Sequence, residues 1–250
     1  MSDAYLYSIL QRETVDVSMT SPARQAADVL LPTIHGWAGK WLVAVSPSGS
    51  FAKGTANRSG TDIDLLISLH DQTPDPLKHI HETLVTALTA AGHQPRRQNV
   101  SIGVNVNGYA VDLVPGKRQN AFTSDHSLYR RRADTWTKTN VDTHIATVQS
   151  GGHSDAIRIL KLWRGQKGLD FPSFYLEMTV FQALAGRYGS LSERVRIALE
   201  YLRDRFEIAR VLDPSNGSNV ISDDLSAAEK QAIKKAATTA LGGSWQDFVR

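Results

Sequence analysis

Residues 48–67, SGSFAKGTANRSGTDIDLLI, place two short motifs between two predicted strands. Hydrophobic residues 41–45 lead into this stretch and residues 63–69 leave it, with turn-forming glycines between them. Successive side chains on a strand point to opposite faces, so Asp62 and Asp64 are expected to share one face, opposite the apolar residues beside them. The stretch therefore predicts a strand, a glycine-rich turn and a second strand that begins with two carboxylates.

Two carboxylates held in this way suit a hard cation. Mg²⁺ prefers oxygen ligands, keeps several waters and commonly completes its shell with substrate phosphates. The turn at Gly49 and Ser50 offers backbone N–H groups where such phosphates would lie. The residues alone thus predict a site for Mg²⁺ and a phosphorylated substrate.

The composition excludes several other kinds of site. The chain has 250 residues and no cysteine, which rules out disulfides, thiolate zinc sites and cysteine nucleophiles. No apolar run approaches the roughly 20 residues that cross a bilayer, and no basic and apolar leader opens the chain, so we expect no membrane partner and a cytoplasmic protein. The net charge of +3 favours polyanionic partners only weakly.

A third carboxylate follows on a later predicted strand. Residues 100–106 alternate in polarity, and Asn107-Gly108 is a favoured hairpin turn into a strand over residues 109–114 that contains Asp112. An unpaired carboxylate among strand apolars costs several kcal/mol or takes up a proton, and a neighbouring cation removes that cost. Asp112 is therefore predicted as a third metal ligand, the alternative being an edge-strand carboxylate that faces water.

Helical patterns surround these strands. Helices are predicted over residues 4–11 and 21–38, with a kink or break at Pro32, and from the prolines at 74 and 76 to residue 91. Residues 115–140 look polar and irregular. Their basic cluster, Arg130 to Arg132, is read as a solvated face or as a contact to phosphate or RNA. Further helices are predicted over residues 141–149, 154–167, 173–188, 190–209 and 226–241.

The Gly49-Ser50 turn, the following Asp-x-Asp and the later Asp112 resemble the signature of the DNA polymerase β-like nucleotidyltransferase superfamily. The resemblance implies an α+β fold, with a palm of mixed β-sheet and flanking helices followed by a helical domain. It implies that Asp62, Asp64 and Asp112 are catalytic and hold two Mg²⁺ ions, for which Mn²⁺ is an alternative. We place the catalytic domain at residues 1–140 and a helical nucleotide-clamping domain at residues 141–250.

The helical half narrows the resemblance. Residues 156–164 and 171–177, with the turn at 213–216, resemble the helical domain of archaeal-type CCA-adding enzymes, oligoadenylate synthases and the bacterial cGAS/DncV-like (CD-NTase) family, and Lys53-Gly54-Thr55 suggests the CD-NTase side. This likeness implies contacts to the donor triphosphate from Lys161, Ser173 and Tyr175, besides Gly49, Ser50 and Lys53.

The residues by themselves leave alternatives open in this half. Lys161 can lie along the core and extend its ammonium toward a cleft, or it can be an ordinary surface lysine. Tyr175 can be a core aromatic, and Glu177 is read as structural.

The combined expectation is an enzyme that joins nucleoside triphosphates into a cyclic or linear oligonucleotide second messenger, which the CD-NTase likeness connects with bacterial antiphage signalling and an effector or activating protein. The alternative acceptor is the 3′ end of tRNA or another RNA. A small-molecule acceptor fits the helical half less well. A binding module without turnover is the non-enzymatic hypothesis.

Overall fold

The computed structural model describes residues 2–16, 18, 20–60 and 62–250, so Thr61 of the opening stretch lies outside the described residues. The chain divides into two compact units. We call residues 16–53 and 61–146 the sheet unit, and residues 1–15, 54–60 and 147–250 the helical unit.

This division differs from the predicted one in three places. The first helix, α1 (Ser2–Arg12), and residues 54–60 cluster with the helical unit, and the later boundary lies at residues 146 and 147. The reason for the first difference is packing, because Leu6, Ile9 and Leu10 are buried in the core that the C-terminal helices build. The sequence pattern showed an amphipathic helix there but not which core it joins.

In the described part of the sheet unit, seven strands form one mixed sheet. The order is β1-β2-β5-β4-β3, with β6 paired to β5 and β7 paired to β6. β2 and β5 are parallel, and the other pairs are antiparallel. The strands are β1 (Leu42–Pro47), β2 (Ile63–Leu69), β3 (Arg96–Arg97), β4 (Ile102–Val106), β5 (Tyr109–Arg118), β6 (His126–Arg130) and β7 (Thr135–Thr139).

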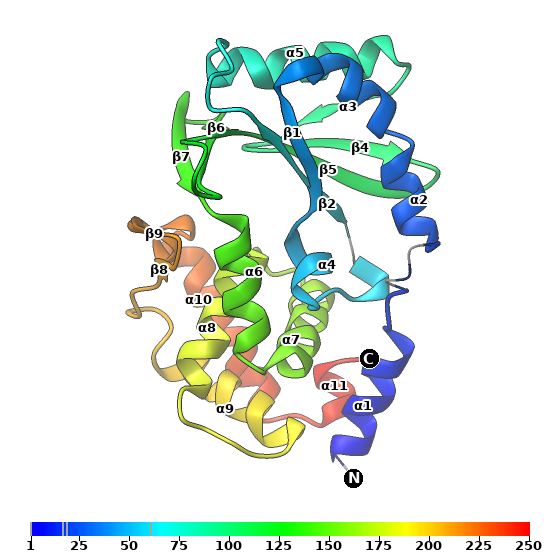
Figure 1. The fold of residues 1–250 in the computed structure, drawn as a ribbon. Helices are drawn as coiled ribbons and strands as arrows, with labels where there is room; N and C mark the ends of the chain where they lie inside the picture. Colours follow the sequence, from blue (N-terminus) through cyan, green and yellow to red (C-terminus); the bar gives the residue numbers. More distant parts are fainter. Residues whose placement is uncertain (1, 17, 19, 61) are drawn as a thin grey trace. The chain divides into compact units, whose positions relative to one another are not determined.

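Helices α2 (Pro22–Asp28), α3 (Leu31–Ala38) and α5 (Leu77–Ala90) cover one face of this sheet (Figure 1). Pro32 lies in the first turn of α3, so the predicted break falls between α2 and α3. Alternate residues of β2, beginning with Ile63 and Leu65, enter this core together with Val111 and Leu113 of β5. The residues between them, including both strand aspartates, therefore belong to the opposite face of the sheet.

The prediction that residues 115–140 are irregular is wrong. β5 continues to Arg118, and β6 and β7 extend the sheet as a hairpin. The sequence His126 to Arg130 has no simple apolar alternation, yet Leu128 and Tyr129 are buried and His126 bonds to Ser68 on β2. Pairing with β5 therefore outweighed a weak local signal.

The helical unit is built from α1, α7 (Ser154–Gln166), α8 (Ser173–Leu184), α9 (Leu191–Asp204), α10 (Ala227–Leu241), the short α11 (Trp245–Phe248) and a hairpin of β8 (Leu212–Asp213) and β9 (Asn216–Val220). α6 (Val141–Ser150) runs across the boundary between the units. α9 and α10 begin with capping boxes at Ser190 and Ser226, which fix their starts. The core of the helical unit contains the aromatic rings of Phe171, Tyr175 and Phe206, which contact one another.

The predicted α+β class, a mixed sheet with flanking helices and a helical part, is confirmed. No helix in residues 2–16, 18, 20–60 and 62–250 is long and apolar enough to cross a membrane.

Candidate active site

The strand aspartates face each other across the one parallel pair found among the described strands. β2 and β5 run in a register that makes Asp64 the Cα partner of Asp112. Their neighbours on both strands are buried against the helices, so alternation turns both carboxylates to the other face. Asp62 lies just before β2 and is exposed. Asp64 and Asp112 thus lie on adjacent strands as the sequence predicted, whereas Asp62 precedes β2 and its predicted face stays a prediction.

The Gly-Ser turn is fitted to Asp64. Gly49 begins the short helix α4 (Gly49–Lys53) with a φ of 58°, a conformation that favours glycine. A Cβ at Gly49 would lie 1.7 Å from Oδ2 of Asp64, which no side chain could accommodate without a shift of the carboxylate. The Ser48 N–H donates to the Asp64 carbonyl oxygen at 2.8 Å. The first motif therefore packs directly on the second.

Asp112 has hydrogen-bonding partners of its own. Gln98 Nε2 donates to Oδ1 of Asp112 at 2.9 Å, and Ser101 Oγ lies 3.4 Å from its Oδ2. Burial raises the pKa of Asp112 above its usual value, and the negative charge of Asp62 raises it further, while the two hydrogen bonds oppose the shift. A bound cation would relieve both of the effects that raise this pKa.

The donor set suits a hard cation in its chemistry, since all three predicted ligands are carboxylates and Asp64 and Asp112 lie on adjacent strands. However, the described residues include no group of three or more His, Asp or Glu side chains gathered closely enough to hold a metal ion. One oxygen of Asp112 is bonded to Gln98 instead. Metal binding by Asp62, Asp64 and Asp112 therefore stays a prediction.

Lys53 and Ser50 complete the predicted residues of the sheet unit. Ser50 is half-buried in α4, and the next residue of this helix, Phe51, is buried. Lys53 ends that helix with a buried side chain, so it does not extend freely into solvent as a phosphate ligand on the surface would. Its predicted contact with phosphate stays untested.

Lys161 is not the ordinary surface lysine that was one of the two alternatives, and its predicted contact with the triphosphate stays a prediction. Its side chain on α7 is 7% exposed, and Nζ forms an ion pair of 2.6 Å with Oε1 of Glu177, which is fully buried on α8. Nζ also donates to Thr55 Oγ1 at 2.8 Å, and the Thr55 hydroxyl donates to Glu177 at 2.8 Å. The structural role predicted for Glu177 is thus accompanied by the same role for Lys161.

Tyr175 and Ser173, both on α8, differ in burial. Tyr175 is fully buried between Phe171 and Phe206, in the aromatic core, and its predicted contact with nucleotide stays a prediction. Burial raises its pKa far above the usual value. Ser173 is half-buried at the start of α8, where its Oγ accepts a hydrogen bond of 2.9 Å from Arg164 Nη1.

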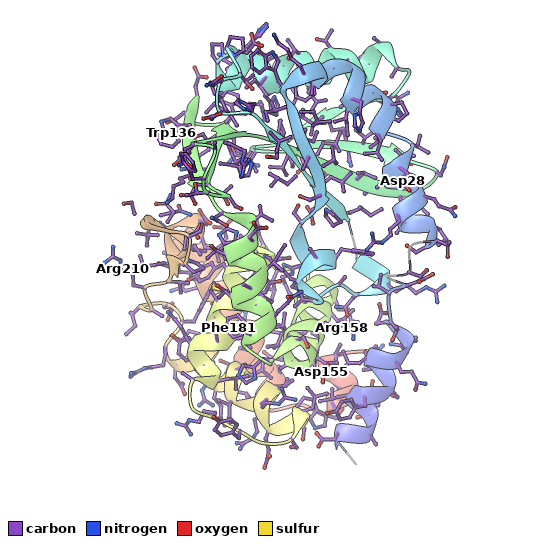
Figure 2. The ribbon with its side chains drawn as sticks, in the orientation of Figure 1. Asp28, Trp136, Asp155, Arg158, Phe181 and Arg210 are labelled. Atoms are coloured by element: carbon purple, nitrogen blue, oxygen red, sulfur yellow. The ribbon has the colours of Figure 1, made fainter. Side chains whose placement is uncertain are left out.

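Residues 54–60, which connect the two motifs, are held by a second polar cluster around Arg158 of α7 (Figure 2). Arg158 Nε donates to the Ala56 carbonyl at 3.0 Å and to Asn57 Oδ1 at 3.1 Å. Its Nη2 donates to the carbonyl oxygens of Leu10 and Glu13 at the end of α1. One arginine therefore ties three distant segments of the helical unit together.

Sequence reasoning missed Gln98, Ser101, Arg158 and Arg164. Gln98 and Ser101 lie in a polar loop beside β4 that carries no motif, so only the register of β4 on β5 brings them to Asp112. The two arginines were detectable in the sequence as charges within apolar helix patterns. In the structure, burial lowers the pKa of each guanidinium, and each donates to backbone carbonyls.

A cavity of about 730 Å³ on the helical unit lies between α8, α9 and the loop before α7. Its lining includes none of the predicted site residues, so its size does not identify the active site.

No family model matches the chain. The chain is 22% identical over 240 residues to a cyclic AMP-AMP-AMP synthase of Escherichia coli (strain MS 115-1), a match that covers 80% of this chain and 75% of that protein.

Solved structures match the fold over almost the whole chain. The Bradyrhizobium diazoefficiens CD-NTase CdnG in complex with GTP matches with a TM-score of 0.80 and 15% identity, over 97% of this chain and 91% of that one. A variant of the Cid1 poly(U) polymerase bound to MgATP matches with a TM-score of 0.69 and 12% identity, over 96% and 93% of the two chains. Together with the parallel aspartate strands below a glycine turn, these matches confirm the predicted resemblance: the chain has the fold of the CD-NTase and poly(U) polymerase structures.

Proposed function

We propose that this nucleotidyltransferase joins nucleoside triphosphates, in the presence of Mg²⁺, into a cyclic or linear oligonucleotide that serves as a second messenger. One observation carries the proposal: Asp64 and Asp112 are in register on parallel strands, beneath a turn that only glycine fits. The relative from E. coli, a cyclic AMP-AMP-AMP synthase, supports the choice of a nucleotide as acceptor.

The roles proposed for the residues follow from their places in the sheet unit. The N–H groups of the Gly49-Ser50 turn would bind the phosphates of the donor nucleotide. Asp62, Asp64 and Asp112 would hold two Mg²⁺ ions, which supply charge neutralisation at the transferring phosphate. Asp112, whose pKa is raised by burial, would also help to take the proton from the attacking ribose hydroxyl.

In the helical unit, the proposed contacts rest mainly on Ser173, because Tyr175 belongs to the core and Lys161 is held by Glu177. A direct contact of Lys161 with the triphosphate would require its ammonium to exchange Thr55 for a phosphate oxygen. We include in the proposal a cytoplasmic location, where nucleoside triphosphates are available, a role in antiphage signalling, and an effector or activating protein as partner.

A second candidate is a template-independent polymerase that extends RNA 3′ ends. The match to the Cid1 poly(U) polymerase favours it, since that fold covers nearly the whole chain as well. At 12% identity the match supports the shared fold and leaves the acceptor to experiment.

The experiment that tests the proposal incubates the purified protein with all four ribonucleoside triphosphates and Mg²⁺, with and without total tRNA. Mass spectrometry identifies small products, and gel analysis measures the length of the RNA. A short oligonucleotide formed without tRNA supports the messenger function, whereas lengthened RNA without such a product supports the second candidate.

Asp64→Asn is the matched test of the site. We expect it to lower pyrophosphate release by at least about 1,000-fold, equivalent to about 4 kcal/mol of transition-state stabilisation. Asp28→Asn, on the exposed side of α2, changes the same chemical group in the same unit and should leave the rate unchanged (Figure 2). Equal rates for the two variants would contradict the assignment of Asp64.

A further inference from the structure

The basic cluster at residues 130–132 begins with the last residue of β6, and its middle member, Arg131, holds a neighbouring loop. Arg131 Nε donates to the Gln98 carbonyl oxygen at 3.0 Å, and the Arg131 N–H donates to the Asn99 carbonyl at 2.8 Å. The Arg132 N–H donates to Asn99 Oδ1 at 3.1 Å. The cluster thus fixes the loop between β3 and β4 from three directions.

Within that loop, both ends of the Gln98 amide are defined. Its Nε2 donates to Asp112 Oδ1 at 2.9 Å, and its Oε1 accepts from the buried Ser101 hydroxyl at 2.7 Å. The Gln98 N–H also donates to the Ser101 carbonyl at 3.0 Å, which closes a turn. The amide therefore cannot rotate without the loss of a hydrogen bond at one end or the other.

Gly103 leaves the space in which Gln98 and Asp112 meet. It is the Cα partner of Asp112 on β4. A Cβ at Gly103 would lie 2.9 Å from Gln98 Nε2 and 3.1 Å from Asp112 Oδ1. The absence of a side chain at this position is what allows the amide to reach the carboxylate.

We propose that Gln98 is a positioning residue for Asp112, and that Arg131 acts through Gln98 by holding its loop. The inference rests on the proposed function, in which Asp112 is catalytic. A carboxylate turns readily about its last bond, and a donor on Oδ1 fixes the plane in which Oδ2 is presented. Reacting groups need this orientation, because a small misplacement costs a large part of the rate.

The three arginines of the cluster differ in their contacts. A contact to RNA or phosphate would make Arg130, Arg131 and Arg132 act alike, as charges on a surface. The observed geometry distinguishes them, because only the Arg131 guanidinium, among the described side chains of the three, has a hydrogen bond to the loop.

The first test is Gln98→Met, which keeps the length of the side chain but removes the donor. We expect kcat for pyrophosphate release to fall by about 10- to 100-fold, as for other residues that orient ligating carboxylates, with the KM for nucleoside triphosphate unchanged. Gln72→Met, an exposed glutamine of the same unit, is the matched control. Thermal unfolding of each variant measures whether the fold is retained.

A second readout does not depend on turnover. Binding of Mn²⁺ to the nucleotide-free protein, measured by electron paramagnetic resonance, should weaken in Gln98→Met and in Gly103→Ala, whose added methyl group displaces the amide. If the wild-type protein shows no turnover, the proposed function fails, and this measurement still decides the inference about Gln98. Wild-type Mn²⁺ affinity in both variants would overturn it.

A double-mutant cycle separates the role of Arg131 from that of its neighbours. Arg131→Met should lower kcat in the wild-type background and have little further effect in the Gln98→Met background, because both changes free the same carboxylate. Arg132→Met serves as the control and should leave kcat unchanged. Additive effects of Arg131→Met and Gln98→Met would show that Arg131 does not act through Gln98.

Discussion

The two units bury charge in opposite ways. In the helical unit, Lys161 and Glu177 are buried as a pair at 2.6 Å, and Thr55 contributes further hydrogen bonds. In the sheet unit, Asp112 is partly buried near a like charge, Asp62, and accepts hydrogen bonds from the neutral side chains of Gln98 and Ser101, while the charge of Arg96 has a smaller opposing effect.

A compensated pair serves the fold, whereas like charges brought together cost stability and are typical of sites that bind a cation or move a proton. We therefore expect Lys161 and Glu177 to stabilise the fold, and the carboxylates of the sheet unit to take part in the reaction.

The largest effect is expected where the compensated pair is broken. Glu177→Leu leaves the Lys161 ammonium buried without its counter-charge, which should lower the free energy of unfolding by about 3–5 kcal/mol. The double variant Lys161→Met, Glu177→Leu removes both charges and should recover most of that loss. Urea unfolding of the single and double variants measures the difference.

The recovered double variant also tests the second role predicted for Lys161. If the lysine only supports the fold, pyrophosphate release should return together with stability. If its ammonium also contacts the triphosphate, the double variant should be stable and slow. A double variant that is no more stable than Glu177→Leu would contradict the compensation argument itself.

A smaller effect of opposite sign is expected at Asp112. Its folded pKa is raised, so the ionised carboxylate destabilises the fold at neutral pH, and Asp112→Asn should raise the free energy of unfolding by about 1 kcal/mol while it abolishes activity. The gain should shrink as the pH falls through the raised pKa, because wild-type Asp112 is then protonated. Urea unfolding at pH 8 and at pH 4, with Asp28→Asn as control, checks both signs.

The smallest effect concerns buried histidines, which occur in both units. Burial lowers the pKa of His81 and His126 in the sheet unit, and of His153 in the helical unit, below the ordinary value of 6.5. As the pH falls below 6.5, the unfolded chain binds protons that the folded chain refuses, so the free energy of unfolding should decrease.

The measurement is urea unfolding at pH 7.5, 6.5 and 5.5 for the wild type and His126→Gln. The variant should lose less stability over this range, because it lacks one of the three groups. Parallel curves for the two proteins would show that folding leaves the pKa of His126 unshifted.

Local pattern was enough for the centre of the site and not for its surroundings. The Gly-Ser turn, the strand at residues 63–69 and the hairpin before Asp112 each follow from short signals, and their register follows from the alternation of buried residues. Gln98 could not be predicted because it lies in the loop between β3 and β4, which carries no motif, and its contact depends on the pairing of β3 with β4. The burial of Tyr175 depends on Phe206, about thirty residues further along the chain.

Lys161 shows a different limit. Its spacing on an apolar helix face is compatible with a lysine that extends to solvent and with one that is buried. Only the position of Glu177 on the next helix decides between them. Residues 115–140 show a third limit, since β6 pairs with β5 and β7 pairs with β6, and the stretch His126 to Arg130 has no simple apolar alternation that would predict the first of these pairings.

The assignment of α1 and residues 54–60 to the helical unit has a consequence for the order of folding during synthesis. The helices that bury Leu6 and Ile9 are synthesised some 150 residues after them, and the Tyr5 hydroxyl bonds to the Val249 carbonyl at 2.8 Å. Contacts so distant in sequence form slowly. The sheet unit, whose last residue is 146, can therefore fold first. Until the later helices are synthesised, the apolar side chains of α1 stay exposed to chaperones.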